Sequence, residues 1–275
     1  MKRFFADVSK FKNFVIYSAR SELKAEVAGS FLSWLWWFLD PLLFMFVYSF
    51  VAVLIFRTNL DHFPVFVFIG LNCWQFFSKM VKCSVRLVTG NKGVVTKVYI
   101  PKHMFILQKM GVHGFKMFVS FGLVALFLIG EAILNTFWGI GAPVVIGPQI
   151  LWTIPLMALL FLGTYAVCVF MTHFGVFVED LTNVITVVLQ LGFYVSGVFY
   201  SFEERLVGTQ YETLGEIITC CNPLSLVMTD MRSAIIGDGE MHYIALLVWT
   251  VISLVLSVIG TKVIYKFENS YVKII

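Results

Sequence analysis

Few residues of this chain have the types and spacings that chemistry requires. The five cysteines contain no CxxC pair and no histidine stands at ligand spacing, so neither a zinc site nor a disulfide framework is indicated. A serine nucleophile needs a histidine within hydrogen-bond reach. Ser196-Gly197 and His242 are candidates, but Tyr194 stands where a Gly-x-Ser-Gly motif requires glycine. An intramembrane serine hydrolase is therefore a weak alternative, and we expect no catalytic residue and no metal site.

A phosphate-binding loop is also missing from the sequence. Gly90-Asn91-Lys92-Gly93 and Gly260-Thr261-Lys262 both lack the glycine spacing of that motif, so we expect no nucleotide hydrolysis by this chain. Ion-coupled carriers normally have ionisable residues inside the membrane, whereas the apolar stretches here contain few, mainly Asp40 beside Pro41. The energy for any transport must therefore come from another chain.

The composition excludes a soluble globule. Of 275 residues, 59% are hydrophobic and 13% are charged, against roughly 45–50% and about 25% in an ordinary soluble domain. With 29 phenylalanines and 7 tryptophans, the chain must lie largely in lipid. At about 20 apolar residues per crossing, it has room for five to seven helical spans.

The apolar stretches predict an all-α integral membrane protein with six transmembrane helices, and we treat residues 1–275 as a single domain. The predicted spans are 34–56, 62–82, 111–133, 150–172, 183–200 and 242–265. Proline inside such helices, as at Pro41 and Pro155, is tolerated because neighbouring helices satisfy the freed backbone groups.

The distribution of lysine and arginine indicates the orientation. Of these 20 residues, 17 lie before the first span, between the second and third, or after the last. Cationic loops are retained in the cytoplasm, so both termini are expected there. The net charge of +4 is then a consequence of topology, and we expect no nucleic-acid partner.

Two segments do not fit simple spans. Residues 4–30 place apolar residues at helical spacing with cations such as Arg20 and Lys24 on the other side, which predicts an amphipathic helix in the membrane interface. Residues 201–241 contain apolar runs too short to cross, interrupted by Asn222-Pro223. They predict two short helices that form a re-entrant hairpin on the outer side, between spans five and six.

Three blocks of sequence carry a family resemblance. The cationic segment Arg20-Ser21-Glu22-Leu23-Lys24 leads through Trp34 into Asp40-Pro41-Leu42-Leu43, and the loop after span two runs from Asn91 to Pro101. The third block comprises Glu179-Asp180-Leu181, Ser196-Gly197-Val198-Phe199-Tyr200, Asn222-Pro223-Leu224 and Arg232. In this order the chain resembles the membrane subunits of ABC-2 type exporters, above all those that export O-antigen, capsule and teichoic-acid polymers.

The blocks cover most of residues 15–235, with two departures from the family pattern. Arginine is more frequent in the family where Glu179 stands, and proline where Gly197 stands. The details of the turn before span five and of the kink at its end are therefore open.

The resemblance implies that residues 91–101 form a coupling helix that docks on a separate ATPase subunit. The residues expected to carry this role are Asn91, Lys92, Lys97, Tyr99 and Pro101. A short element with lysines and a wedge of Val98, Tyr99 and Ile100 has the chemistry to sit in a groove of a soluble protein. The alternative is a cationic cytoplasmic loop without a partner. ATP and magnesium would bind the partner ATPase, and no cofactor is expected on this chain.

The resemblance also places spans one and five at the seam of a homodimer, where aromatic side chains could line a path for sugars. The candidates are Trp34, Trp37, Tyr48, Phe193, Tyr194, Phe199 and Tyr200. Aromatic faces offer many small contacts to the C–H face of a sugar. The alternative is that these rings face lipid, as aromatics do in every membrane protein.

Lys79, Lys82 and Arg86 form a further cationic group near the cytoplasmic end of span two. They could meet the pyrophosphate of a lipid-linked polymer, or the headgroups of anionic phospholipids.

We therefore expect the permease subunit of an ATP-driven exporter in the cytoplasmic membrane of a bacterium. It would act as a homodimer with two copies of an ABC ATPase subunit and move a lipid-linked polysaccharide. The nearest alternative is an ABC-2 exporter of a small drug or lipid.

Overall fold

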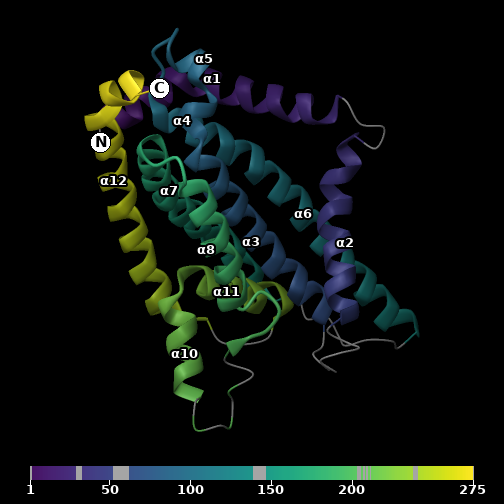
Figure 1. The fold of residues 1–275 in the computed structure, drawn as a ribbon. Helices are drawn as coiled ribbons and strands as arrows, with labels where there is room; N and C mark the ends of the chain where they lie inside the picture. Colours follow the sequence, from purple (N-terminus) through teal and green to yellow (C-terminus); the bar gives the residue numbers. More distant parts are fainter. Residues whose placement is uncertain are drawn as a thin grey trace.

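The computed structural model describes residues 2–28, 33–51, 62–138, 147–202, 206, 208, 210, 212–237 and 241–274. The described residues are helical or irregular, with no β-strand among them, so the all-α prediction is confirmed. Figure 1 shows a bundle of long helices with α1 (Lys2–Val27) lying across one end.

Four helices are long and apolar enough to cross a membrane, and two shorter apolar helices accompany them. The long ones are α3 (Phe63–Val85), α6 (Lys102–Trp138), α7 (Thr153–Phe177) and α12 (Tyr243–Ile274), and the shorter ones are α2 (Trp36–Val51) and α8 (Leu181–Val195). The 3-10 turns η1 (Ser33–Leu35) and η3 (Pro148–Trp152) precede α2 and α7. Each of the six predicted spans thus overlaps one helix.

Helix ends differ from the predicted span ends for local reasons. The sequence 52–61, in which the first predicted span ends, lies outside the described residues. Helices α6 and α12 extend well beyond the apolar stretches, into the cationic end of the molecule. Helix α8 ends at Val195, before the predicted end at residue 200. Gly197 follows with a φ of 67°, a left-handed conformation that glycine adopts without steric cost.

The predicted interfacial helix is α1, which begins and ends close to the predicted bounds of 4 and 30. It packs along the first part of α6, with Phe14 against Phe105 at a ring-centroid distance of 5.7 Å. Two ion pairs of 2.5 Å, Glu22 with Lys109 and Glu26 with Lys116, reinforce this contact. The side chains of Arg20 and Lys24 are exposed.

The core is organised around α3. This helix packs against α2, α6, α7, α8 and α11 (Pro223–Ile236), and most of its residues are buried. The C-terminal end of α3 lies so close to α7 that a Cβ on Gly175 of α7 would lie 1.9 Å from the carbonyl oxygen of Val85, the last residue of α3. Only a glycine permits that contact, which holds the C-terminal end of α3 against α7.

Two short helices occupy the segment between α8 and α12, as predicted. Helix α10 (Glu212–Cys221) and α11 meet at Asn222, whose side-chain oxygen accepts hydrogen bonds from the backbone N–H groups of Leu224 and Ser225. This side-chain cap starts α11, which is buried against α3 and α7. Residues 203–205, 207, 209, 211 and 238–240 of the predicted hairpin lie outside the described residues.

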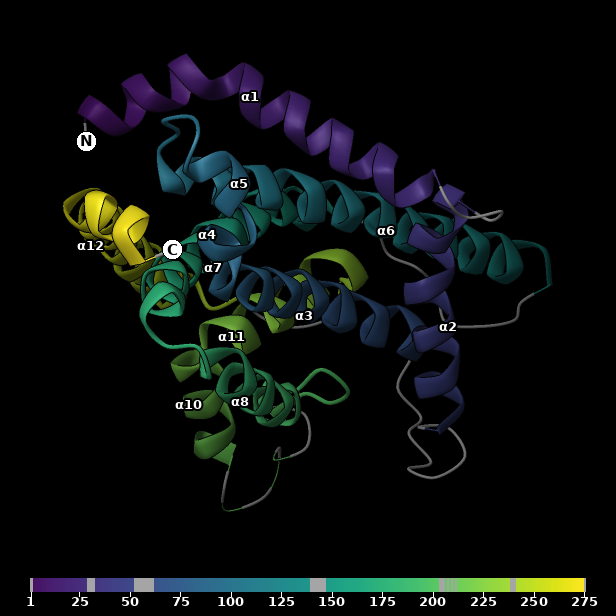
Figure 2. The ribbon, with the colours of Figure 1, turned by 45° about the horizontal axis from the view of Figure 1, so that its top comes forward.

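The start of α1 and the end of α12 lie at the same end of the bundle as two one-turn helices, α4 (Leu87–Gly90) and α5 (Lys92–Val95). Helix α10 lies at the opposite end (Figure 1). Figure 2, which turns this end forward, shows α1 passing beside α5 and along α6. The cationic end of the molecule therefore gathers segments from both ends and the middle of the chain.

Candidate functional site

The loop between α3 and α6 contains only one short turn of the predicted coupling helix. Helix α5 is four residues long, and residues 96–101 are irregular. Asn91 joins α4 to α5 and its side-chain amide donates a hydrogen bond to the carbonyl oxygen of Leu87 at 2.7 Å. Lys92 and Lys97 are exposed. We call residues 91–101 the docking loop.

The tip of the docking loop is apolar and partly exposed. Val98 is 57% and Tyr99 56% exposed. Ile100, which was expected to complete the wedge, is buried instead and packs into the core of the chain. Pro101 is buried as well, directly before α6. The wedge prediction is therefore wrong for Ile100, because the last two residues of the loop fasten it to the bundle.

Tyr99 has an exposed ring and a bound hydroxyl group. Its hydroxyl donates a hydrogen bond to Oε2 of Glu268 on α12 at 3.0 Å and accepts one from Nη2 of Arg3 on α1 at 2.7 Å. Partial burial and the hydrogen bond to the Glu268 carboxylate raise the pKa of Tyr99 above its ordinary value of 10. The hydroxyl therefore stays protonated at neutral pH and remains a donor.

Five of the seven predicted path aromatics lie together. The ring of Tyr48 on α2 lies 4.2 Å from that of Phe199, which lies 5.1 Å from that of Phe193 on α8. Tyr194 is next in sequence, and its carbonyl oxygen accepts a hydrogen bond from the hydroxyl of Tyr200 at 2.5 Å. We call these five residues the aromatic cluster.

Trp74 of α3 was not among the predicted residues, yet its ring contacts that of Phe193 at 5.6 Å. Nothing in its local sequence distinguishes it from a core tryptophan, and only the packing of α8 on α3 reveals the contact.

The two predicted tryptophans lie elsewhere. Trp34 in η1 is exposed and contacts Phe38 of α2 at 5.8 Å. Trp37 packs on Phe115 of α6 at 5.7 Å. Among the described contacts, neither ring touches the aromatic cluster, so the seven residues do not form one row within a single chain. Trp37 and Tyr48 are eleven residues apart in α2, about 16 Å along the helix axis, so the two rings meet different neighbours.

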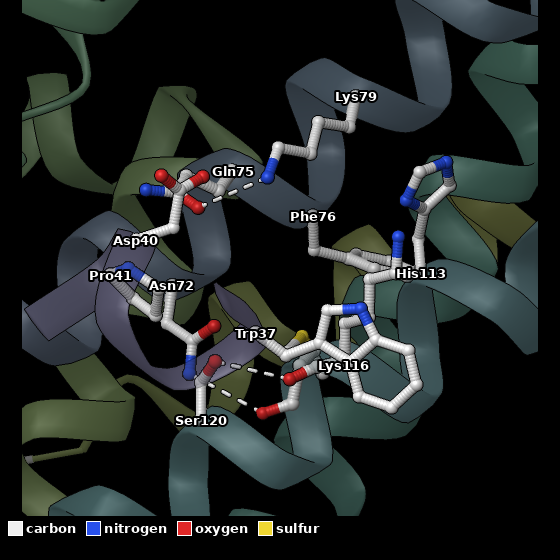
Figure 3. Close-up of a pocket in the computed structure, with 11 residues that line it drawn as sticks. Trp37, Asp40, Pro41, Asn72, Gln75, Phe76, Lys79, His113, Lys116 and Ser120 are labelled. Carbon is white, nitrogen blue, oxygen red and sulfur yellow. Dashed lines mark hydrogen bonds between the residues drawn. The ribbon is translucent and has the colours of Figure 1, made fainter. Parts of the chain in front are cut away.

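A small polar cavity of about 50 Å³ lies between α2, α3 and α6 (Figure 3). Its lining includes Trp37, Asp40, Asn72, Gln75, Phe76, Lys79, His113, Lys116 and Ser120. Asp40 and Lys79 both point into it, and Nζ of Lys79 donates to Oε1 of Gln75 at 3.4 Å. The sequence singled out Asp40 and Lys79, whereas His113 and Asn72 pass unnoticed within apolar stretches.

The three predicted headgroup cations have different surroundings. Lys79 lines the polar cavity. Lys82 lines a separate cavity of about 310 Å³ together with Phe193 and Tyr194, beside the aromatic cluster. Nε of Arg86 donates to the hydroxyl of Thr182 at the start of α8, at 3.0 Å. They do not form one site, and Lys82 alone of the three lies beside the predicted path.

The proposed hydrolase residues are engaged in two separate pairs. The hydroxyl of Ser196 accepts a hydrogen bond from the amide of Asn222 at 3.2 Å. Nδ1 of His242 lies 2.8 Å from Oδ1 of the buried Asp230. Both pairs fasten α11 to its neighbours, which is a structural role.

No family model matches the chain. It is similar to the O-antigen export system permease protein RfbA of Myxococcus xanthus, with 27% identity over 233 residues that cover 85% of this chain and 84% of that protein. It is also similar to two proteins of the same name from Klebsiella pneumoniae. They are 23% and 21% identical, each over 95% of this chain and 94% of their own length. The resemblance drawn from the sequence blocks is thus confirmed, and the chain is a distant homologue of the O-antigen export system permease proteins.

Proposed function

We propose that this protein is the membrane permease subunit of an ATP-driven exporter of a polysaccharide. The observation that carries the proposal is similarity to O-antigen export permeases over nearly the full length of both chains. The long apolar helices agree with a multi-pass membrane protein. The subunit is not itself an enzyme, and ATP with its magnesium would bind a separate ATPase chain. The O-antigen relatives favour a polymer over a small drug or lipid as the cargo.

For the topology, we infer six spans with both termini in the cytoplasm. The shared location of both chain ends and the docking loop at the cationic end supports this orientation (Figure 1). Helix α1 would then lie in the cytoplasmic interface. Helices α10 and α11 would dip in from the outside as a re-entrant hairpin, which the burial of α11 between α3 and α7 favours, since polar backbone ends survive at membrane depth only against protein.

For the assembly, we infer a homodimer with two ATPase subunits. Helices α2 and α8 leave large apolar side chains exposed on the side where the aromatic cluster lies, including Phe44, Val187 and Tyr194. A second copy packed there would put two aromatic clusters and two Lys82 side chains along one seam. Sugars of a lipid-linked polymer could slide along such rings, while the lysines attract its phosphate.

For the ATPase, we infer docking on the exposed tip of the docking loop. Val98 and the ring of Tyr99 offer an apolar anchor, with Lys92 and Lys97 as a cationic rim. Truncation of an aromatic anchor at an interface costs about 2 kcal/mol or more, and reversal of a rim charge slows association.

The test is the double variant Tyr99→Ala with Lys97→Glu, co-expressed with the cognate ATPase. We expect normal permease abundance, loss of ATPase co-purification and loss of surface polymer. The matched control is Tyr17→Ala with Lys12→Glu, which makes the same chemical changes on the exposed side of α1. Full retention of the ATPase by the docking-loop variant contradicts the docking role, and equal loss in both variants contradicts its assignment to this loop.

A further inference from the structure

The docking loop is attached to two distant parts of the chain through one side chain. Arg3, Tyr99 and Glu268 form a closed triangle, because Nη2 of Arg3 also donates to Oε2 of Glu268, at 3.2 Å. The three residues belong to the start of α1, the docking loop and the end of α12. We call them the loop triangle. No local feature of the sequence connects them, since 169 residues separate Tyr99 from Glu268.

A second set of contacts fixes the triangle to the bundle. The hydroxyl of Tyr265 donates to Oδ2 of Asp7 at 2.6 Å and lies 3.4 Å from Nε2 of His103 at the start of α6. The guanidinium of Arg3 lies 4.2 Å above the ring of Tyr265. The start of α1 is therefore bonded to α12, and α12 to α6, directly beneath the docking loop.

The triangle is partly buried and has unused hydrogen-bonding capacity. The side chain of Glu268 is 9% exposed and its Oε1 has no hydrogen-bond partner among the described residues. Lys102 is 2% exposed, and its Nζ donates to the carbonyl oxygen of Ile100 at 3.3 Å. A buried carboxylate oxygen without a donor is costly, so a small shift of the loop that brings it a donor would be favoured.

Along the covalent chain, the docking loop is not adjacent to α1 or to α12. The docking loop is joined in sequence to α4 and α6, and it consists of the four-residue helix α5 and an irregular stretch. Force applied to the ring of Tyr99 would first bend that stretch. The hydroxyl of the same residue supplies the shorter connection, a single hydrogen bond to each of the other two helices.

We propose that Tyr99 is a positioning residue that transmits movement of the docked ATPase to α1 and α12 through its hydroxyl, separately from the docking contact made by its ring. This inference rests on the proposed function, in which the ring is the docking anchor. Coupling of this kind requires two conformations of the permease that differ in these contacts. In this proposal the second arrangement pairs the free Oε1 of Glu268 with Lys102, whose charge already interacts with that carboxylate.

The test is Tyr99→Phe in the complete permease–ATPase complex, which keeps the ring and removes the hydroxyl. We expect the ATPase to co-purify as in the parent, ATP hydrolysis to continue, and polymer export to fall about five-fold or more, the smallest effect typical of a coupling between sites. Tyr271→Phe is the control, because it removes a hydrogen bond to His173 at the same end of α12 without touching the loop. We expect it to export at the parental rate.

A double-mutant cycle identifies the partner of the hydroxyl. Glu268→Leu, which removes the acceptor, should lower export similarly, and the combination with Tyr99→Phe should be no worse than the more severe single variant, since each removes the hydrogen bond between these two side chains. If Tyr99→Phe lowers the abundance of the permease, Arg3→Gln takes the place of Tyr99→Phe in the cycle. Arg3 is mostly exposed, and its substitution removes the ion pair with Glu268.

The outcomes separate the two proposals. Parental export by Tyr99→Phe, or fully additive losses in the cycle, overturns the transmission role while docking by the ring stands. Loss of the ATPase from Tyr99→Phe also overturns it, because the hydroxyl then belongs to the docking contact. Retention of the ATPase by Tyr99→Ala with Lys97→Glu refutes the docking role itself, and the transmission role with it.

Discussion

The two ends of the molecule each contain an arginine that joins distant segments, but they use it differently. Arg232 on α11 is 5% exposed and donates to three backbone carbonyl oxygens, those of Phe66, Gly197 and Val198, at 3.1, 3.1 and 2.6 Å. Its guanidinium also lies 3.6 Å from the centre of the Phe66 ring. Arg3 is mostly exposed and bonds to side chains.

This difference separates a fixed connection from an adjustable one. Backbone carbonyls move only with their helices, so Arg232 holds α3, the break after α8 and α11 in one arrangement. Side-chain partners can exchange by rotation about their χ angles without moving a helix. The end at α11 is thus built as a rigid junction, and the cationic end as a set of contacts that can rearrange.

The largest effect is expected from removal of Arg232. Arg232→Met keeps an unbranched apolar stem but removes the guanidinium, which leaves the carbonyls of Gly197 and Val198 without this donor. Hydrogen bonds to charged groups contribute about 1.5–3 kcal/mol each, so we expect a loss of at least about 3 kcal/mol and low abundance. Thermal unfolding of the detergent-solubilised permease measures it. Stability equal to the parent would show that the junction is not held by Arg232.

The second prediction concerns the space around the same junction. A Cβ on Gly70 would lie 2.3 Å from Nη2 of Arg232 and 2.8 Å from the carbonyl oxygen of Val198. Gly70→Ala should therefore destabilise the permease by about 1–3 kcal/mol, the usual cost of overpacking. Gly122→Ala on α6 is the matched control, since no described atom lies within 4 Å of its Cβ position. The same thermal measurement should give no loss for the control, and equal melting of both variants contradicts a tightly packed junction.

The helices could be predicted from the sequence because each follows from a local property. Apolar stretches place α3 and α7, and the Asn222-Pro223 pair places the boundary between α10 and α11. The alternation of cationic and apolar residues places α1. The sequence also selected Tyr48 and Phe199, which the structure brings within 4.2 Å.

The remaining features depend on contacts between distant residues and leave no local pattern. Nothing near Ile100 indicates that it turns inward while Tyr99 stays exposed. Glu268 looks like an ordinary charge at the end of an apolar helix, and only the folded chain places it against Tyr99. Arg232 was assigned to a family block, but its three carbonyl partners come from α3 and from the segment after α8.

The smallest effect is expected from the ion pairs that attach α1 to α6. Burial alone would raise the pKa of Glu22, but hydrogen bonds from Lys109 at 2.5 Å and Gln108 at 2.6 Å outweigh it, so the pKa lies below the ordinary value of 4.5. The pKa of Glu22 is lower when α1 is packed on α6 than when it is detached. The contribution of this carboxylate to the packing is therefore fully present above pH 4.5 and is lost as the pH falls through the pKa of the packed state. Both side chains are about a quarter exposed, which limits it to about 1 kcal/mol or less.

Hydrogen exchange of the α1 peptides between pH 3 and 7, corrected for the intrinsic exchange rate, measures this attachment. We expect protection of residues 16–26 to decrease toward the acidic end, and Glu22→Gln to show the reduced protection already at pH 7. Glu179→Gln, in the exposed turn between α7 and α8, should leave the profile of α1 unchanged. Under the same acid conditions the peptides of α11 should lose less protection than those of α1, since the carbonyl partners of Arg232 do not titrate and, among the described contacts of α11, only the Asp230–His242 pair does. An equal loss of protection in α1 and α11 would contradict the distinction between an adjustable cationic end and a fixed junction at Arg232.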